Sequence, residues 1–383
     1  MCAMNLLSKL GLIGIVSFSV CGYAGITPSA EAVDQKTVAA YRTALLDQAY
    51  DIASAMPLDP HIKDRSRAQE KVLQAALELD QPSRALRYAE GIANWRRGKG
   101  YADYACYMAG HGVTNDMPVL LKKADSIARA AKQEWRRDAV LQRIEQANAL
   151  SKPQPSEQPP ATFEEKFSEI DAVVLKGNLD DATALVQSCL RLYGEYYTNE
   201  AHRNQLRQKI EESWNGLPVF LRLNAFQEMA TVALDHQDLG TALQMADDAV
   251  AMMAGNTWPV EYSIPQIARF ASIRDQAGEP TAAFNDLQKA LQTFREQQSE
   301  IVDIDRAEAL VPLAEAALAM NDPDTARAVY NAALDAAVLN ANSRPRATDL
   351  SMICVSMAVT GFEPDEALLV KLDRLQEELG DPW

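Results

Sequence analysis

A chain of 383 residues exceeds the usual size of about 100–200 residues for one compact core, so we expect either two domains or one repeat array. The formal net charge of −16, from 37 Lys and Arg against 53 Asp and Glu, excludes a nucleic-acid footprint over the whole surface, and no nucleic-acid partner is predicted. The charge is uneven, with +2 in residues 25–150 and −19 in residues 151–383, which predicts two modules.

The first 24 residues have the pattern of an export signal. Lys9 precedes the apolar run LGLIGIVSFSV (10–20), and Gly22-Tyr23-Ala24 supplies small residues for cleavage after Ala24. We therefore expect a mature protein that is periplasmic or secreted, with no integral membrane span. Lipid anchoring through Cys21 is an alternative, although no small residue directly precedes this cysteine.

Beyond the leader, the chain repeats one short pattern. Copies read GNLDDATALVQSCL (177–190), HQDLGTALQMADDAV (236–250), GEPTAAFNDLQKAL (278–291) and NDPDTARAVYNAAL (321–334). Five residues after a turn residue comes an alanine, and steps of four and three lead to further apolar or small residues on one helical stripe. The turn residues and alanines pair as Asp80 with Ala85, Gly177 with Ala182, Gln237 with Ala242, Gly278 with Ala283 and Asn321 with Ala326.

A helix is predicted on each side of every turn. Pro82, Pro280 and Pro323 stand two residues after the turn residue. In the first turn of a helix an N–H group has no acceptor within the helix, so proline, which lacks this group, is tolerated there. Seven residues before the turn is another small position, such as Ala230 or Ala314. Each unit is thus predicted to be an antiparallel helix pair, and the fold class all-α.

These offsets resemble the tetratricopeptide repeat. The resemblance covers most of residues 65–372 and implies a superhelical array of helix pairs that binds proteins or peptides. Tandem units recur at about 40 to 43 residues, longer than the family period of about 34, which places the array between that family and HEAT-like arrays.

One arginine recurs in register eight residues before the small position of each first helix. The six copies are Arg65, Arg97, Arg137, Arg222, Arg306 and Arg346. In one interpretation each arginine braces its unit by binding an acidic residue, such as Asp303 or Asp305, or a backbone carbonyl. In the other, the arginines line a groove for an anionic ligand.

In chain order, residues 25–150 form an N-terminal helical repeat module that ends in a single capping helix from Arg136 to about Leu150. The segment SKPQPSEQPPAT (151–162) is predicted to be a Pro-rich linker, and residues 163–383 a C-terminal repeat module. Within this second module, residues 193–216 are predicted to contain an extra helix.

Two aromatic groups are candidate partner contacts. One is the tyrosine-rich insertion, with Tyr193, Tyr196, Tyr197 and Trp214. The other is the repeated WRR motif, with Trp95, Arg96, Trp135 and Arg136. Both groups have a structural alternative, in which the rings cover joins between repeats.

No catalytic, metal or cofactor pattern is present. HExxH, GxSxG and CxxC are absent, and Gly98-Lys99-Gly100 lacks the context of a phosphate loop. Asp235 and His236 belong to a turn in which acidic residues cap helices. Cys106, Cys189 and Cys354 are predicted to be buried and unpaired.

We therefore expect a non-enzymatic exported repeat protein that binds a protein or peptide, without cofactors. The alternative is a carbohydrate-binding or carbohydrate-active envelope protein on an all-α scaffold, with aromatic rings stacking on sugars.

Overall fold

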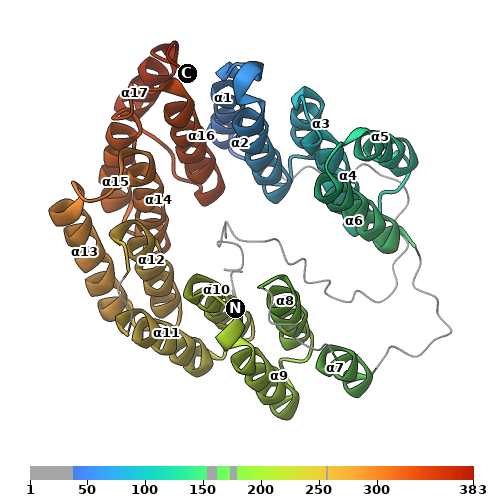
Figure 1. Cartoon of the computed structure of the whole chain (residues 1–383). Helices are drawn as coiled ribbons and strands as arrows, with labels where there is room; N and C mark the ends of the chain where they lie inside the picture. The colour runs from blue at the N-terminus through green and yellow to red at the C-terminus, as the bar shows by residue number, and fades with distance from the viewer. Residues whose placement is uncertain (1–37, 153–161, 173–178, 256–257) are drawn as a thin grey trace, which may run out of the picture.

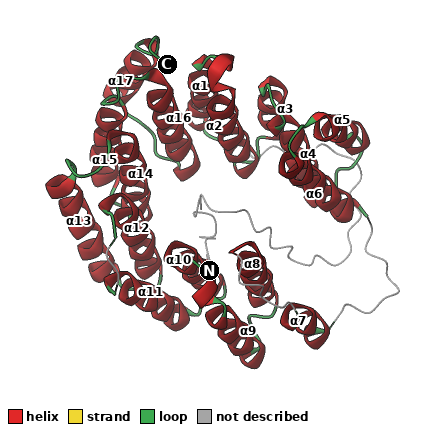
Figure 2. Ribbon diagram, in the orientation of Figure 1, coloured by secondary structure: helices red, strands yellow, loops and turns green. Residues whose placement is uncertain are grey.

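The computed structural model describes residues 38–152, 162–172, 179–255 and 258–383. In these residues the chain forms seventeen α-helices and one short 3₁₀ helix, and Figure 2 shows helices and loops with no strand. The predicted all-α fold is confirmed. The predicted leader (1–24) and all but the ends of the predicted linker (151–162) lie outside the described residues.

The helices follow one another with short connections. The N-terminal part contains α1 (Ala40–Ala55), α2 (Leu58–Glu78), α3 (Pro82–Gly91), α4 (Arg96–Gly110), α5 (Met117–Ala130) and α6 (Glu134–Ser151). After the linker come α7 (Phe163–Asp171), α8 (Leu179–Glu195), α9 (Glu200–Glu212), the 3₁₀ helix (Trp214–Gly216), α10 (Val219–Asp235), α11 (Leu239–Ala254), α12 (Val260–Gln276), α13 (Pro280–Gln297), α14 (Asp303–Ala319), α15 (Pro323–Ala337), α16 (Ser343–Thr360) and α17 (Glu366–Glu377). The predicted capping helix is α6, and the predicted extra helix is α9.

The small residues predicted on the second helices are in the core. Ala85, Ala182, Ala242, Ala283 and Ala326 are each at most 2% exposed. Because alanine has no side chain beyond Cβ, the first and second helices of a unit approach closely along this stripe. The spacing of the repeat thus follows from close helix packing.

The turn residues have the backbone conformation that ends a helix. Positive φ angles occur at Asp80 (55°), Gly112 (73°), Gln237 (60°), Gly278 (93°), Asn321 (58°) and Gly361 (76°). After Gln237, the N–H of Asp238 donates to the carbonyl of Ala233 at 2.8 Å, which is the closing bond of a Schellman cap. The Asp238 carboxylate then accepts from the N–H of Thr241 at 3.0 Å and caps the second helix. A three-residue turn therefore ends one helix and starts the next.

The order of the helices in space differs from their order in the chain. Figure 1 shows α1 and α2 beside α16, and the contact between α1 and α16 is among the most extensive in the described structure. The array that runs from α7 to α17 thus continues through α1 to α6. α1 takes the place of a second helix for α16, because it packs against both α16 and α2.

Polar contacts join α1 to the end of α16. The Arg42 guanidinium donates to the carbonyls of Ala358 and Val359, each at 2.6 Å, and the Tyr41 hydroxyl donates to the carbonyl of Gly361 at 2.7 Å. The last carbonyls of a helix have no partner within the helix, and they carry its partial negative charge. Arg42 satisfies two of them and brings a cation to the favourable end of the helix dipole.

One hydrophobic core crosses the boundary between the two predicted modules. Leu46 and Ile52 of α1 are fully buried in the same cluster as Ile353 and Met357 of α16. A second cluster lies mainly between α7 and α12. The N-terminal helices are therefore packed into the array and are not a separate globule.

Candidate functional site

Most first helices of the repeat units lie on the inner side of the curved array, where Figure 1 also shows α8. Figure 1 shows α10, α12, α14, α16, α2, α4 and α6 on this side, with α11, α13, α15, α3 and α5 outside. We call these seven first helices the inner wall. Their exposed side chains are the ones available to a ligand held within the curve.

The two WRR motifs meet in space. The rings of Trp95 and Trp135 contact each other edge-on, with centroids 5.4 Å apart. The guanidinium groups of Arg96 and Arg136 lie over the Trp95 and Trp135 rings, at 4.8 and 5.0 Å. Trp135 is 59% exposed, whereas Trp95 packs against the core. Partner binding by these four residues stays a prediction, with Trp135 exposed and Arg136 half-buried.

The tyrosine-rich insertion is largely packed inside. Tyr193 is fully buried, and Tyr197 is 3% exposed. The Tyr197 hydroxyl donates to Asp238 at 2.9 Å, and the Trp214 ring packs edge-on against Phe226. Tyr193 and Tyr197 thus have a packing role here, and partner contact stays a prediction for the half-buried Tyr196 and Trp214.

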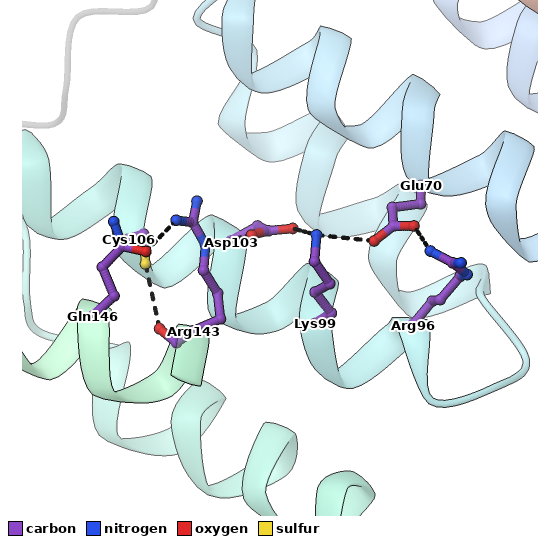
Figure 3. Close-up of polar contacts among 7 residues, drawn as sticks. All are labelled: Glu70, Arg96, Lys99, Asp103, Cys106, Arg143 and Gln146. Carbon is purple, nitrogen blue, oxygen red and sulfur yellow. Dashed lines mark hydrogen bonds and ion pairs between the residues drawn. The ribbon is translucent and has the colours of Figure 1, made fainter. Parts of the chain in front are cut away.

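A chain of alternating charges joins α2, α4 and α6 (Figure 3). Arg96 pairs with the buried Glu70, whose other oxygen lies 3.0 Å from the Lys99 ammonium. Lys99 also lies 3.2 Å from Asp103, to which Arg143 donates at 2.5 Å. Burial by itself lowers the pKa of Lys99, but the carboxylates of Asp103 and Glu70 raise it by more, so the net effect is a raised pKa. This part of the inner wall pairs its own charges, including that of Arg96.

Three of the in-register arginines brace the start of their helices. Arg65, Arg222 and Arg306 each donate at 2.9 Å to a carbonyl in the preceding connection, at Met56, Leu217 and Ile301. Arg306 thus binds a carbonyl, and not Asp303 or Asp305. The bracing interpretation holds for these three, whereas Arg137, among the described residues, pairs only with exposed acids on its own helix.

Replacing Arg306 by alanine is expected to lower the free energy of unfolding by about 1.5–3 kcal/mol, because the buried Ile301 carbonyl loses a charged donor. Urea denaturation of the full chain measures this. The matched control is Arg137→Ala, whose exposed ion pairs contribute little to stability. An unchanged midpoint for Arg306→Ala would count against bracing.

Acidic side chains gather elsewhere on the inner wall, where α2, α14 and α16 meet. The Ser356 hydroxyl donates to Glu315 at 2.7 Å and accepts from the Tyr330 hydroxyl at 2.8 Å. Burial raises the pKa of Glu315 to about 6, and the Arg269 charge on α12 opposes this shift. Desolvation by the neighbouring helices, and then the charge of Glu315, raise the pKa of Glu78 on α2, whose side chain still has part of its surface open to solvent.

Asp349 on α16 is a buried carboxylate, only 6% exposed. It has no hydrogen bond or ion pair with any described residue. Burial raises the pKa of Asp349 to about 8, and the charges of Glu308, Asp305 and Asp303 on α14 add to the shift. The sequence analysis did not select Asp349, although its position in the repeat indicates burial, because other first helices have mostly small or apolar residues there. The same position in the other first helices is Ala68, Gly100, Val140, Ala225, Gln266 and Ala309.

The described residues offer no assembled metal site or reactive thiol. No group of three His, Cys, Asp or Glu side chains in this part of the chain converges on a metal position. Cys106, Cys189 and Cys354 are buried and unpaired, as predicted. Burial raises the pKa of Cys106 and Cys189 to about 11, so these thiols stay protonated near neutral pH.

An apolar groove lies on the outer side of the array, between α13 and α15. Leu291, Phe294 and Val329 line it, with Arg295 and Gln298 at its edge.

No protein-family model matches the sequence, and no curated protein matches it.

Proposed function

We propose that this protein is a non-enzymatic, tetratricopeptide-like repeat protein that holds a protein or peptide partner against its inner wall. The supporting observation is the arrangement of the first helices along one curved side, with the packing surfaces of each unit buried against its neighbours (Figure 1). A stacked array of this kind buries its own core and leaves a long inner surface free for a ligand. Extended partners make many weak contacts along such a surface.

We place this function in an exported compartment, on the strength of the leader at residues 1–24. In the described residues, no helix combines the length and apolar character needed to cross a bilayer. The predicted leader is the feature of the sequence that favours a periplasmic or secreted scaffold.

Site-specific crosslinking in the native cell envelope tests the proposal. A photoreactive amino acid would replace Gln74, which is exposed on α2 of the inner wall, and in a second variant Gln292, exposed on the outer α13. We expect discrete crosslinked products at Gln74 and none at Gln292. Equal labelling at both positions, or no discrete product at either, would contradict partner binding on the inner wall.

Carbohydrate binding is the second candidate, because the rings of one tryptophan and one tyrosine are more than half exposed. Tyr262 is 60% exposed and Trp135 is 59% exposed, and such rings stack on sugar faces. A glycan array probed with the mature chain distinguishes the two functions. Binding that is lost in Trp135→Ala or Tyr262→Ala would support the carbohydrate reading.

A further inference from the structure

The two WRR motifs stand in the same register of α4 and α6, but their first arginines differ in charge pairing. The Arg96 guanidinium lies over the Trp95 ring, and Figure 3 shows its ion pair with Glu70 of α2. The Arg136 guanidinium lies over the Trp135 ring in the same way. It makes no hydrogen bond or ion pair with any described residue, and its Nε is buried without an acceptor. Arg136 therefore repeats the stacking of Arg96 and lacks its carboxylate.

The repeat explains why this carboxylate is missing. Glu70 stands five residues after Arg65, the in-register arginine of α2. Five residues after Arg97, the in-register arginine of α4, stands Ala102. Since α2 packs against α4 and α4 packs against α6, Ala102 holds the position from which a carboxylate would pair with Arg136. Alanine has no such group, so the protein leaves this cation without the partner that Arg96 has.

Nearby acids do not supply the missing charge. Residues 117–143 contain seven basic and three acidic side chains. All three acids pair with an arginine of their own helix, namely Asp125 with Arg129, and Glu134 and Asp138 with Arg137. Lys132, in the connection before α6, is exposed and makes no ion pair with a described residue. The start of α6 thus has positive charge that the described part of the chain does not neutralise.

The geometry of Arg136 suits a carboxylate from outside the protein. A guanidinium that is stacked on an aromatic ring still has its in-plane N–H donors, which form a fork that matches the two oxygens of a carboxylate. Arg136 is half-buried, and partial burial strengthens an ion pair because water screens it less. The Trp135 ring, 59% exposed, offers apolar surface beside this cation to the rest of the ligand.

We propose that Trp135 and Arg136 at the start of α6 bind an acidic segment of the partner protein, with an aspartate or glutamate carboxylate on Arg136 in the arrangement that Glu70 makes with Arg96. This inference rests on the proposed function and specifies the chemistry of the partner. The pair of Glu70 with Arg96 supports it, because that pair is an example, inside the same array, of a side-chain carboxylate bound beside a Trp–Arg stack.

Fluorescence anisotropy with the full chain beyond the predicted leader tests this inference. The probes are a labelled twelve-residue peptide that contains four glutamates and the same peptide with glutamine at those positions. We expect the glutamate peptide to bind and the glutamine peptide to bind about tenfold more weakly or not at all, because only a carboxylate forms a charge-assisted pair with Arg136. Equal binding of the two peptides would overturn the inference.

The neighbouring arginine provides a matched control. Arg136→Gln should lower the affinity for the glutamate peptide about tenfold. Arg137→Gln removes the same charge one residue away, but this guanidinium is already paired with Glu134 and Asp138, so affinity should stay within about threefold. A thermal melt of each variant checks that it is folded. Equal losses in the two variants would show a general effect of charge and would overturn the site.

A second variant tests the comparison between the units. Ala102→Glu restores the carboxylate that α2 has at Glu70, and it should occupy Arg136 from within the chain. Affinity for the glutamate peptide should then fall about tenfold although Arg136 is intact, and Ala102→Glu should cause no further loss when combined with Arg136→Gln. If folded Ala102→Glu binds the glutamate peptide as the wild type does, the carboxylate position inferred from Glu70 is wrong.

The outcomes for partner binding and for partner chemistry are separable. If crosslinking at Gln74 yields a partner but the glutamate peptide binds no better than the glutamine peptide, the inference fails and the proposed function stands. If no partner is crosslinked and Arg136→Gln and Arg137→Gln bind the glutamate peptide equally, both fail.

Discussion

Replacing Asp349 by alanine is expected to stabilise the protein, and to do so more at pH 8 than at pH 5. The pKa of this carboxyl is about 8 in the folded state against 3.8 for an unperturbed aspartate. Between these values the folded state holds a proton that the unfolded chain has released. Stability from this group is therefore fully present below about pH 4 and is lost as the pH rises to about 8.

The slope of this loss is at most about 1.4 kcal/mol per pH unit, so several kcal/mol depend on one side chain. Alanine occupies the same register in α2, α10 and α14, at Ala68, Ala225 and Ala309, and thus fits the position. Urea denaturation at pH 5, 6, 7 and 8 gives the free energies of unfolding for the wild type and Asp349→Ala.

A shallower pH dependence should remain in Asp349→Ala, because the raised pKa of Glu315, about 6, acts in the same direction. The control is Asp324→Asn, an exposed acid at the start of α15. If Asp349→Ala is no more stable than the wild type at pH 8, burial of the Asp349 carboxylate does not destabilise the folded state as expected.

The second large effect is expected at the contact between α1 and α16. Arg42→Ala should lower the free energy of unfolding by about 3 kcal/mol, since two carbonyls at the end of α16 lose a charged donor and the helix dipole loses a cation. Hydrogen exchange should quicken in α16 as well as in α1, although the two helices lie at opposite ends of the sequence.

The location of the effect is as informative as its size. Arg129→Ala is the control, because Arg129 is exposed and pairs only with Asp125 on its own helix. If faster exchange in Arg42→Ala stays within α1 and α2, the N-terminal helices are an appendage and not part of a continuous array. The same contact implies that residues 163–383 alone would expose the apolar face of α16, including Ile353 and Met357.

Local features of the units were predictable from the sequence because they depend on backbone chemistry within a few residues. A left-handed turn residue at Gly278 or Asn321, a proline at the first helical position and an alanine five residues after the turn are all part of one hairpin. The predicted turns and helix starts at these sites are confirmed. So is the burial of Cys106, Cys189 and Cys354, whose apolar spacing was visible in the sequence.

The candidate site was harder to predict. Arg96 and the tyrosines stood out in the sequence because they are large and unusual at their positions, yet Arg96 is paired with Glu70 and Tyr193 is buried. Asp349 was not selected, because a lone aspartate in a helix does not by itself indicate burial, and only a comparison with the small or apolar residues in the same register of other first helices does. Its environment comes from α14 and α2, which contribute residues some 40 and 280 positions away in the chain.

By itself, then, the sequence determined the all-α class, the helix pairs and their turns, since each of these depends on interactions between near neighbours in the chain. Only the tertiary structure decided that α1 completes the C-terminal repeats, that the two WRR motifs touch, and that the Asp349 side chain of α16 is buried. Those features depend on which distant surfaces pack against each other. The hydrophobic effect is non-directional, so the sequence of one apolar face does not specify which other face will bury it.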